Sequence, residues 1–181
     1  MKTLLILSLL IFSIPTVAKQ YLPKNKQTVL GLYVTAKEAF AKRHIIPNKV
    51  KILDVRTQGE YIFVGHASMA INIPLEFLNR GIDLKKMNPI MSLNYNFVDE
   101  VKKRFNKTDV IMIICRSGVR SAISVNKLAQ AGFKNVYNIT DGFEGDKSNV
   151  MDDFSNGKRI VNGWKNSNLP WTYQLDPELV Y

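Results

Sequence analysis

An uninterrupted apolar run, Val110 to Ile114, constrains the fold more than any other segment of this 181-residue chain. The run shows no polar alternation, so both of its faces must be buried, as in the central strand of a parallel sheet. Short apolar segments at 51–55, 68–73 and 136–139 are bounded by turn-forming residues and predict further strands. Helical patterns separate these segments. Such alternation predicts an α/β fold with a mostly parallel central sheet flanked by helices.

Capping residues mark where the helices begin. Thr35-Ala-Lys-Glu38 and Thr57-Gln-Gly-Glu60 both have the spacing of a capping box, which predicts a helix starting at each. Asn96 is expected to cap a third helix, and a fourth is expected to end at Gly132. Residues 76–95 show no clear period and are expected to be irregular.

The first eighteen residues have the pattern of an export signal. Lys2 precedes the apolar run 4–14, which is shorter than the ~20 residues needed to span a bilayer. Pro15 ends the run, and residues 16–18 supply the small side chains of a cleavage site. We therefore expect cleavage after residue 18, a periplasmic location and no stable membrane insertion afterwards. A retained N-terminal anchor is the alternative.

The chain is strongly basic, with a formal net charge of +10. Such a balance attracts small oxyanions, phospholipid surfaces or nucleic acid. Nucleic acid is a poor partner for an exported chain whose lysines are scattered, so we expect none. We favour a solvated basic surface over a dedicated anionic partner. The residues that remain after cleavage suit a single domain, which we expect to be monomeric.

Cys115 is the only cysteine of the chain. An exported protein with one cysteine cannot close an internal disulfide. The thiol is therefore inert and buried, paired with another chain, or reactive. Cys115 follows the most apolar strand directly, at the edge where parallel α/β sheets bind ligands. With two histidines and one cysteine, no usual metal cluster can form, and we expect neither metal nor cofactor.

The segment Cys115-Arg-Ser-Gly-Val-Arg120 joins that strand to a helix. Gly118 can adopt backbone angles that other residues avoid, and a tight loop entering a helix turns its N–H groups inward. Two arginines add full positive charges. Such a loop favours the nucleophilic thiolate and holds an oxyanion or a persulfide beside it. The expected anion cradle consists of Arg116, Ser117, Gly118, Val119 and Arg120.

The length of the loop separates two chemistries. Cysteine phosphatases need an arginine at the sixth position after the cysteine, where it grips the phosphoryl oxygens. Here Ser121 occupies that position and Arg120 falls one residue short. The short loop favours a smaller target, such as a sulfur atom, and makes a phosphatase or arsenate reductase a distant third interpretation.

The loop from Cys115 to Ser121 resembles the active-site loop of the rhodanese family, and the similarity extends over residues 33–173. The resemblance implies a single rhodanese-like domain, preceded by an exposed lead-in at 19–32 and followed by a C-terminal tail at 174–181. The other segments that carry it are Leu53–Arg56 with Glu60-Tyr61, Gly65-His66, Ala70–Pro74, Gly132-Phe133, Val136-Tyr137, Asp141–Gly145 and 162–171.

The resemblance implies a sulfurtransferase. The Cys115 thiolate would attack the sulfane sulfur of thiosulfate or a similar anion, sulfite would leave, and a persulfide would pass its sulfur to cyanide, a thiol or a protein acceptor. The loop N–H groups would stabilise the developing charge. The alternative is a non-enzymatic module of the same fold that carries or binds sulfur for one protein partner.

The remaining candidate residues are expected to support the loop rather than react. The resemblance implies that Asp54, Arg56 and Glu60 are scaffold, with Arg56 able to pair with Glu60. His66 resembles a structural turn residue. Residues 76–95 could wall the site or form an idle surface loop, and the sequence leaves that choice open.

Overall fold

The computed structural model describes residues 22–151 and 153–181. The export signal expected at 1–18, together with residues 19–21 of the lead-in, lies outside the described residues. Within the described part of the chain, no helix is both long and apolar enough to cross a bilayer.

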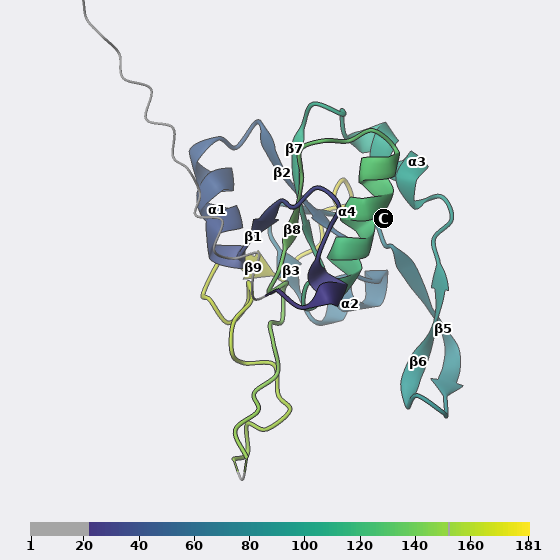
Figure 1. The fold of residues 1–181 in the computed structure, drawn as a ribbon, viewed down its shortest axis with the longest axis vertical. Helices are drawn as coiled ribbons and strands as arrows, with labels where there is room; N and C mark the ends of the chain where they lie inside the picture. The colour runs from purple at the N-terminus through teal and green to yellow at the C-terminus, as the bar shows by residue number, and fades with distance from the viewer. Residues whose placement is uncertain (1–21, 152) are drawn as a thin grey trace, which may run out of the picture.

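A five-stranded parallel sheet forms the centre of the molecule (Figure 1). Its strand order is β1 (Tyr33–Val34), β8 (Val136–Ile139), β7 (Val110–Ile114), β2 (Val50–Asp54) and β4 (Ala70–Asn72). All neighbouring pairs are parallel. The apolar run is the middle strand, and all of it except its first residue is buried. The α/β fold with a mostly parallel sheet, predicted from that run, is confirmed.

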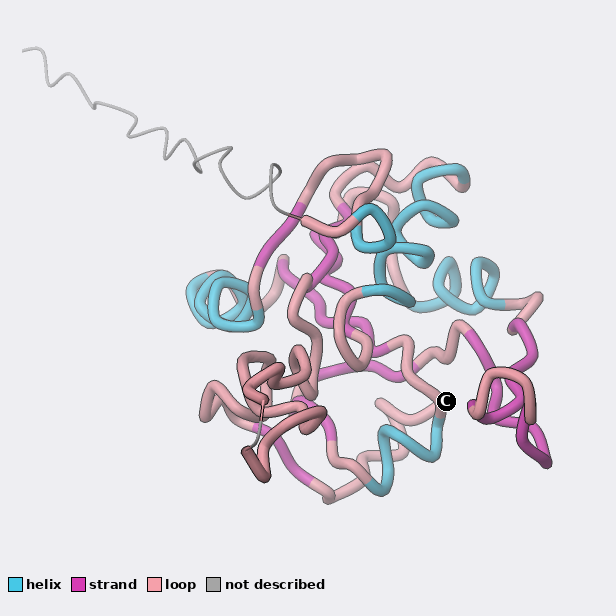
Figure 2. The backbone as a smooth tube through the Cα atoms, turned by 60° about the horizontal axis from the view of Figure 1, so that its bottom comes forward, coloured by secondary structure: helices cyan, strands magenta, loops and turns pink. Residues whose placement is uncertain are grey.

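Helices cover both faces of the sheet (Figure 2). Residues of α1 (Ala36–Ile45) and α2 (Gln58–Phe63) are buried against one face. Residues of α3 (Phe97–Arg104) and α4 (Val119–Gln130) are buried against the other. This two-sided cover explains why β7 needs no polar face.

Alternate residues of β7 enter two separate cores. Ile111 and Ile113 pack with α3 and α4, whereas Met112 and Ile114 pack on the opposite side with the fully buried Trp164. Side chains alternate in direction along a strand, so the strand is anchored from both faces. The residue that follows Ile114 therefore begins from a rigid position.

Two of the three predicted caps form. Thr35 and Thr57 each close a capping box at the start of their helices. The Asn96 side chain makes no cap hydrogen bond, so that prediction was wrong. Asn96 has backbone angles of φ −88° and ψ 0°, outside the extended conformation that an N-cap normally adopts. Instead, the Asn94 side chain accepts a hydrogen bond from the Asn96 N–H at 3.0 Å.

Residues 76–95 are ordered rather than irregular, which corrects the sequence-based expectation. They form an antiparallel hairpin of β5 (Glu76–Asp83) and β6 (Asn88–Leu93), which projects from the body (Figure 1). The pairing register shifts between Leu78 and Ile82. This irregularity interrupts the two-residue alternation by which a strand is recognised. Pro89 also argues against a strand in β6, because proline cannot donate a ladder hydrogen bond.

The C-terminal residues return to the body. β9 (Trp171–Thr172) pairs antiparallel with β3 (His66–Ala67). The expected tail at 174–181 touches the edge of the sheet, where the Asn72 N–H donates to the Leu179 carbonyl at 2.7 Å. Within the described part of the chain, residues 146–161 form a second projection on the same side as the hairpin (Figure 1).

Candidate active site

Cys115 lies at the carboxyl end of β7 and is only 1% exposed. The chain reaches the first residue of α4 within four positions. It does so through Gly118, whose φ of 96° lies in the left-handed region. This turn aims the Gly118 N–H at the cysteine, and it donates to Sγ at 3.1 Å. The loop therefore presents a backbone donor to the sulfur, as the motif predicts.

A chain of side-chain hydrogen bonds holds the other side of the sulfur. Ser121 Oγ lies 3.3 Å from Cys115 Sγ and 2.6 Å from Asn138 Oδ1. The Asn138 amide donates to the carbonyls of Lys26 and Gly118, at 2.9 and 3.1 Å. Because both amide hydrogens of Asn138 are used in this way, its Oδ1 faces Ser121 and accepts a hydrogen bond from the Ser121 hydroxyl. In this arrangement Ser121 accepts a hydrogen bond from the neutral Cys115 thiol, and its hydroxyl must turn from Asn138 to donate to a thiolate.

The turn after β8 supports the loop from behind. The Phe143 N–H donates to the Cys115 carbonyl at 2.8 Å, and the Glu144 N–H donates to the Arg116 carbonyl at 3.0 Å. Gly142 has a φ of 65°, and a Cβ there would lie 2.6 Å from the Ser117 nitrogen. Only glycine lets these two segments approach so closely.

Arg120 and Glu60 form a two-point ion pair across the site. Arg120 Nη1 and Nη2 donate to the two Glu60 oxygens at 2.7 and 2.6 Å. The same carboxylate accepts from the Thr57 N–H at 3.0 Å, which completes the cap of α2. Glu60 thus ties α2 to the first turn of α4. The expected pairing of Glu60 with Arg56 is wrong.

Arg56 instead pairs with Asp54, on the same strand end. Their side chains are fully buried and approach to 2.7 Å. Arg56 also donates to the Gly65 carbonyl, and its guanidinium lies 4.1 Å from the centre of the Phe143 ring. Phe143 in turn binds the Cys115 carbonyl. Asp54 and Arg56 therefore lie beneath the loop, in a structural position.

His66 is buried away from the pocket that contains Cys115. Its ring stacks on Tyr61 at 3.7 Å between ring centres, and Nδ1 lies 3.0 Å from the Tyr61 carbonyl. Since a carbonyl only accepts, Nδ1 carries the hydrogen. These contacts make His66 part of the packing.

A pocket of about 560 Å³ opens over Cys115. Its floor is the loop from Cys115 to Arg120 together with Glu60, and one wall is the β5–β6 hairpin. The segment that the sequence left undecided is therefore a wall of this pocket. The hairpin residues that line it are Glu76, Leu78, Asn88, Pro89 and Met91.

Arg159 is a lining residue that the sequence reasoning missed. It comes from the second projection, and its Nη1 donates to the Gly145 carbonyl at 2.6 Å. Partial burial and the positive charge of Arg116 both lower the pKa of Arg159. Both arginines line the pocket. No local sequence pattern around Arg159 predicts its place in the pocket, because only the fold brings Arg159 to the pocket that contains Cys115. Asn138 was missed for the same reason.

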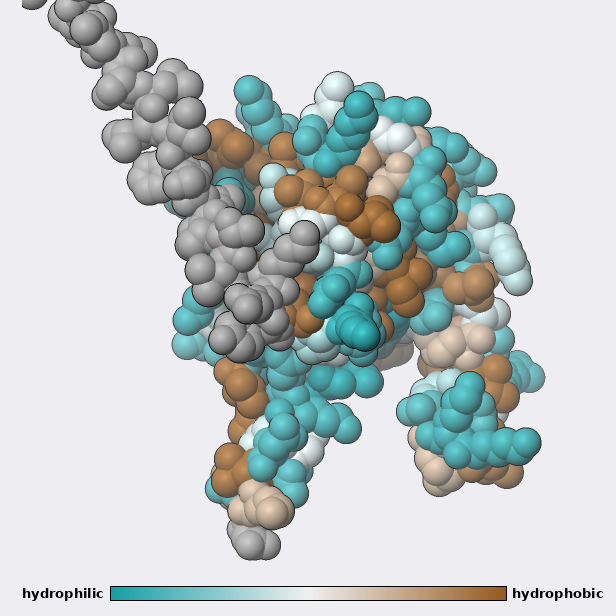
Figure 3. All heavy atoms as spheres, viewed as in Figure 1, coloured by the Kyte–Doolittle hydropathy of each residue, from teal (hydrophilic) through white to brown (hydrophobic). Residues whose placement is uncertain are grey.

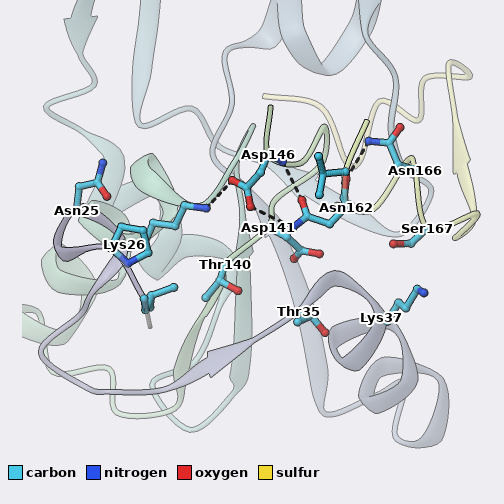
Figure 4. Close-up of a pocket in the computed structure, with 13 residues that line it drawn as sticks. Asn25, Lys26, Thr35, Lys37, Thr140, Asp141, Asp146, Asn162, Asn166 and Ser167 are labelled. Carbon is cyan, nitrogen blue, oxygen red and sulfur yellow. Dashed lines mark hydrogen bonds and ion pairs between the residues drawn. The ribbon is translucent and has the colours of Figure 1, made fainter. Parts of the chain in front are cut away.

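A second hollow, of about 770 Å³, lies on the side of the N-terminal lead-in (Figure 4). Three of its charged side chains, Lys26, Asp141 and Asp146, are held by hydrogen bonds or an ion pair. Lys26 Nζ binds Asp146 at 2.8 Å, and the Asn162 amide binds the same carboxylate at 3.0 Å. Asp141 accepts from the N–H groups of Ala36 and Gly163, although burial raises its pKa. These bonds join the lead-in and loops and point to a structural role.

The Glu60–Arg120 pair predicts a specific dependence of stability on pH. Burial raises the pKa of Glu60, but the hydrogen bonds and charge of Arg120 outweigh burial and lower the pKa from 4.5 to about 2. A depressed carboxyl pKa stabilises the fold fully above pH 4.5, and this contribution is lost as the pH falls towards 2. We expect the ionised Glu60 to contribute on the order of 2 kcal/mol at neutral pH.

Glu60→Gln tests this expectation, because glutamine keeps the capping box but removes the charge. Urea unfolding should show the variant less stable than the parent at pH 7, with the gap shrinking steadily between pH 4.5 and 2. Glu38→Gln changes the exposed capping box of α1 and is the matched control. A gap that stays constant with pH would contradict the assignment.

Comparisons with known proteins agree with this geometry. The family described as the rhodanese-like domain matches residues 35–149. An uncharacterized protein of Rickettsia prowazekii, RP600, is 39% identical over 132 residues, which cover 71% of this chain and 88% of that protein. "Thiosulfate sulfurtransferase 16, chloroplastic" of Arabidopsis thaliana is 38% identical over 93 residues, covering 51% of this chain and 70% of that protein.

A solved structure has a similar fold. The crystal structure of Rv0390 from M. tuberculosis superposes with a TM-score of 0.61 at 26% identity, covering 78% of this chain and 96% of that chain. In this α/β fold, the central parallel strand ends in a cysteine loop beneath a pocket lined by three arginines. These features define the class of protein to which the chain belongs. The chain is a member of the rhodanese family.

Proposed function

We propose that this protein is a sulfurtransferase that carries sulfane sulfur on Cys115. The observation that carries the proposal is the placement of Sγ. It receives the Gly118 N–H at 3.1 Å, at the floor of a pocket lined by Arg116, Arg120 and Arg159. A donor at the start of a helix and nearby cations favour a negatively charged sulfur. Both the thiolate and the persulfide that follows from it are such species.

The reaction proceeds in two displacements. The Cys115 thiolate attacks the sulfane sulfur of thiosulfate, a new S–S bond forms, and the bond to the sulfonate sulfur breaks with its electron pair leaving on sulfite. The product is a Cys115 persulfide anion. Cyanide or a thiolate then attacks the outer sulfur, and the electron pair of the S–S bond returns to Cys115 as thiolate. A persulfide-type donor fits the same first step, with a thiolate as the leaving group.

Sulfur loading tests the proposal directly. After incubation with thiosulfate, the intact protein should gain the mass of one sulfur atom, and cyanide should remove it as thiocyanate. Cys115→Ser should gain nothing, and because Cys115 is the only cysteine, any adduct is unambiguous. Asn25→Ser, at the other hollow, is the matched control and should load like the parent. Failure of the parent to load from both thiosulfate and a persulfide would refute the proposal.

A further inference from the structure

We propose that the β5–β6 hairpin selects the sulfur donor, and that the preferred donor is an anionic sulfane compound carrying an apolar organic body. This inference rests on the proposed function and names the substrate class of the same pocket. The hairpin is a specificity-determining element, and its residues take no part in the chemical steps at Cys115.

One face of the hairpin is directed at the site. Leu78 and Met91 are paired across the two strands, so their side chains lie on the same face, and both line the pocket. Pro89, two residues before Met91, lines it as well. Ile90 falls between them and projects to the opposite face, because successive side chains of a strand alternate. The part of the wall formed by Leu78, Pro89 and Met91 is therefore apolar, whereas Glu76 and Asn88, at the starts of the two strands, are polar.

The positive charges of the pocket come from elements other than the hairpin. Arg116 and Arg159 stand at the floor and the second projection, while Arg120 is paired with Glu60. With Glu76 at the base of the hairpin included, the ionised lining residues are three arginines and two glutamates. The net positive charge favours an anion beside the sulfur, and the hairpin favours an apolar group further out.

The size of the pocket exceeds what thiosulfate requires. A volume of about 560 Å³ lies within the ~300–1,000 Å³ typical of sites for organic ligands, and thiosulfate would fill only its floor. The space left over lies against Leu78, which is 59% exposed. The hairpin also carries exposed apolar side chains further out (Figure 3). An apolar body seated above the reacting sulfur would cover Leu78 and Met91 and displace water from them.

Organic thiosulfonates are suitable probes of this class. In their reaction the Cys115 thiolate takes the sulfane sulfur, the bond to the sulfonyl sulfur breaks, and its electron pair leaves on a sulfinate. Benzenethiosulfonate and methanethiosulfonate share charge and reacting atoms and differ only in the apolar body. Their sulfinate products bind without reaction and report the pocket alone.

Binding to the unreactive Cys115→Ser protein gives the first test. Benzenesulfinate should bind about tenfold more tightly than methanesulfinate by calorimetry, a ratio equivalent to about 1.4 kcal/mol. Met91→Gln and, separately, Leu78→Gln should abolish this preference, because each places a neutral polar amide where the ring would lie. Ile90→Gln, one position away on the opposite face, should preserve it.

Kinetics in the parent background give the second test. Met91→Gln should lower kcat/KM for benzenethiosulfonate about tenfold while changing that for thiosulfate less than twofold. An equal loss for both donors, an equal effect of Ile90→Gln, or no preference for benzenesulfinate in Cys115→Ser protein with an unaltered hairpin would each overturn the inference. Failure of the proposed function looks different, since no donor would then load Cys115, whereas the sulfinate binding does not depend on sulfur transfer.

Discussion

Arg120→Ala is expected to lower kcat/KM for thiosulfate by about a hundredfold, a loss comparable to removing one charge-stabilising donor from an enzyme site. The substitution removes a cation from the pocket lining and also frees the Glu60 carboxylate, which lines the same pocket. An unpaired anion so close to Cys115 repels both the donor and the persulfide. Arg116→Ala removes a cation without freeing an acid, so its effect should be smaller. Steady-state rates of thiocyanate formation measure both.

The double variant Arg120→Ala/Glu60→Gln separates the two effects. If the freed carboxylate causes most of the loss, removing its charge should restore about tenfold of the activity. Glu60→Gln alone controls for the change in α2, whose cap glutamine can maintain. A double variant no better than Arg120→Ala would mean that Arg120 acts on the donor directly, as the loop motif alone suggests, and that its pairing with Glu60 is incidental.

The centre of the fold could be predicted from local sequence patterns alone. Val110 to Ile114 could be assigned as a central strand because a short all-apolar run between helical patterns is typical of a parallel strand buried on both faces. The position of Cys115 and the turn at Gly118 followed from the same segment. Both capping boxes were also local, since each depends on residues three apart. These features are encoded within a few residues, so sequence is enough to find them.

Long-range partners were harder to predict. Glu60 lies sixty positions from Arg120, and nothing in either segment shows that Arg56 prefers the nearer Asp54. Arg159 comes from a polar loop with no period of its own. The hairpin escaped detection because its register shifts midway. In each case the contact depends on how distant elements pack, which the local propensities of the chain do not determine.

The loop at Cys115 is fixed by neighbours on several sides. Asn138 holds the Gly118 carbonyl, and Phe143 and Glu144 hold the carbonyls of Cys115 and Arg116. These bonds occupy the loop carbonyls and hold the Gly118 N–H towards the sulfur. A preorganised donor costs little reorganisation when charge develops on the sulfur. The site should therefore be sensitive to small displacements of the supporting turn.

Gly142→Ala tests that sensitivity and should destabilise the protein by about 3 kcal/mol or more, judged by urea unfolding. Two costs combine. The φ of 65° is unfavourable for alanine, and the added Cβ would stand 2.6 Å from both the Cys115 carbonyl and the Ser117 nitrogen. Backbone atoms cannot move aside as a flexible side chain can. The loop must therefore shift, and sulfur loading of Cys115 should slow together with the loss of stability.

Two other glycines of the chain separate these costs. Gly157 has a φ of 77° but open space around it, so Gly157→Ala should cost about 1 kcal/mol, from the backbone alone. Gly59 is in α2 with no atom within 4 Å of the added Cβ and an ordinary φ. Gly59→Ala should therefore leave stability unchanged or raise it by up to about 1 kcal/mol. A Gly142→Ala protein as stable and as easily loaded as Gly157→Ala would show that close approach of the turn does not position the loop.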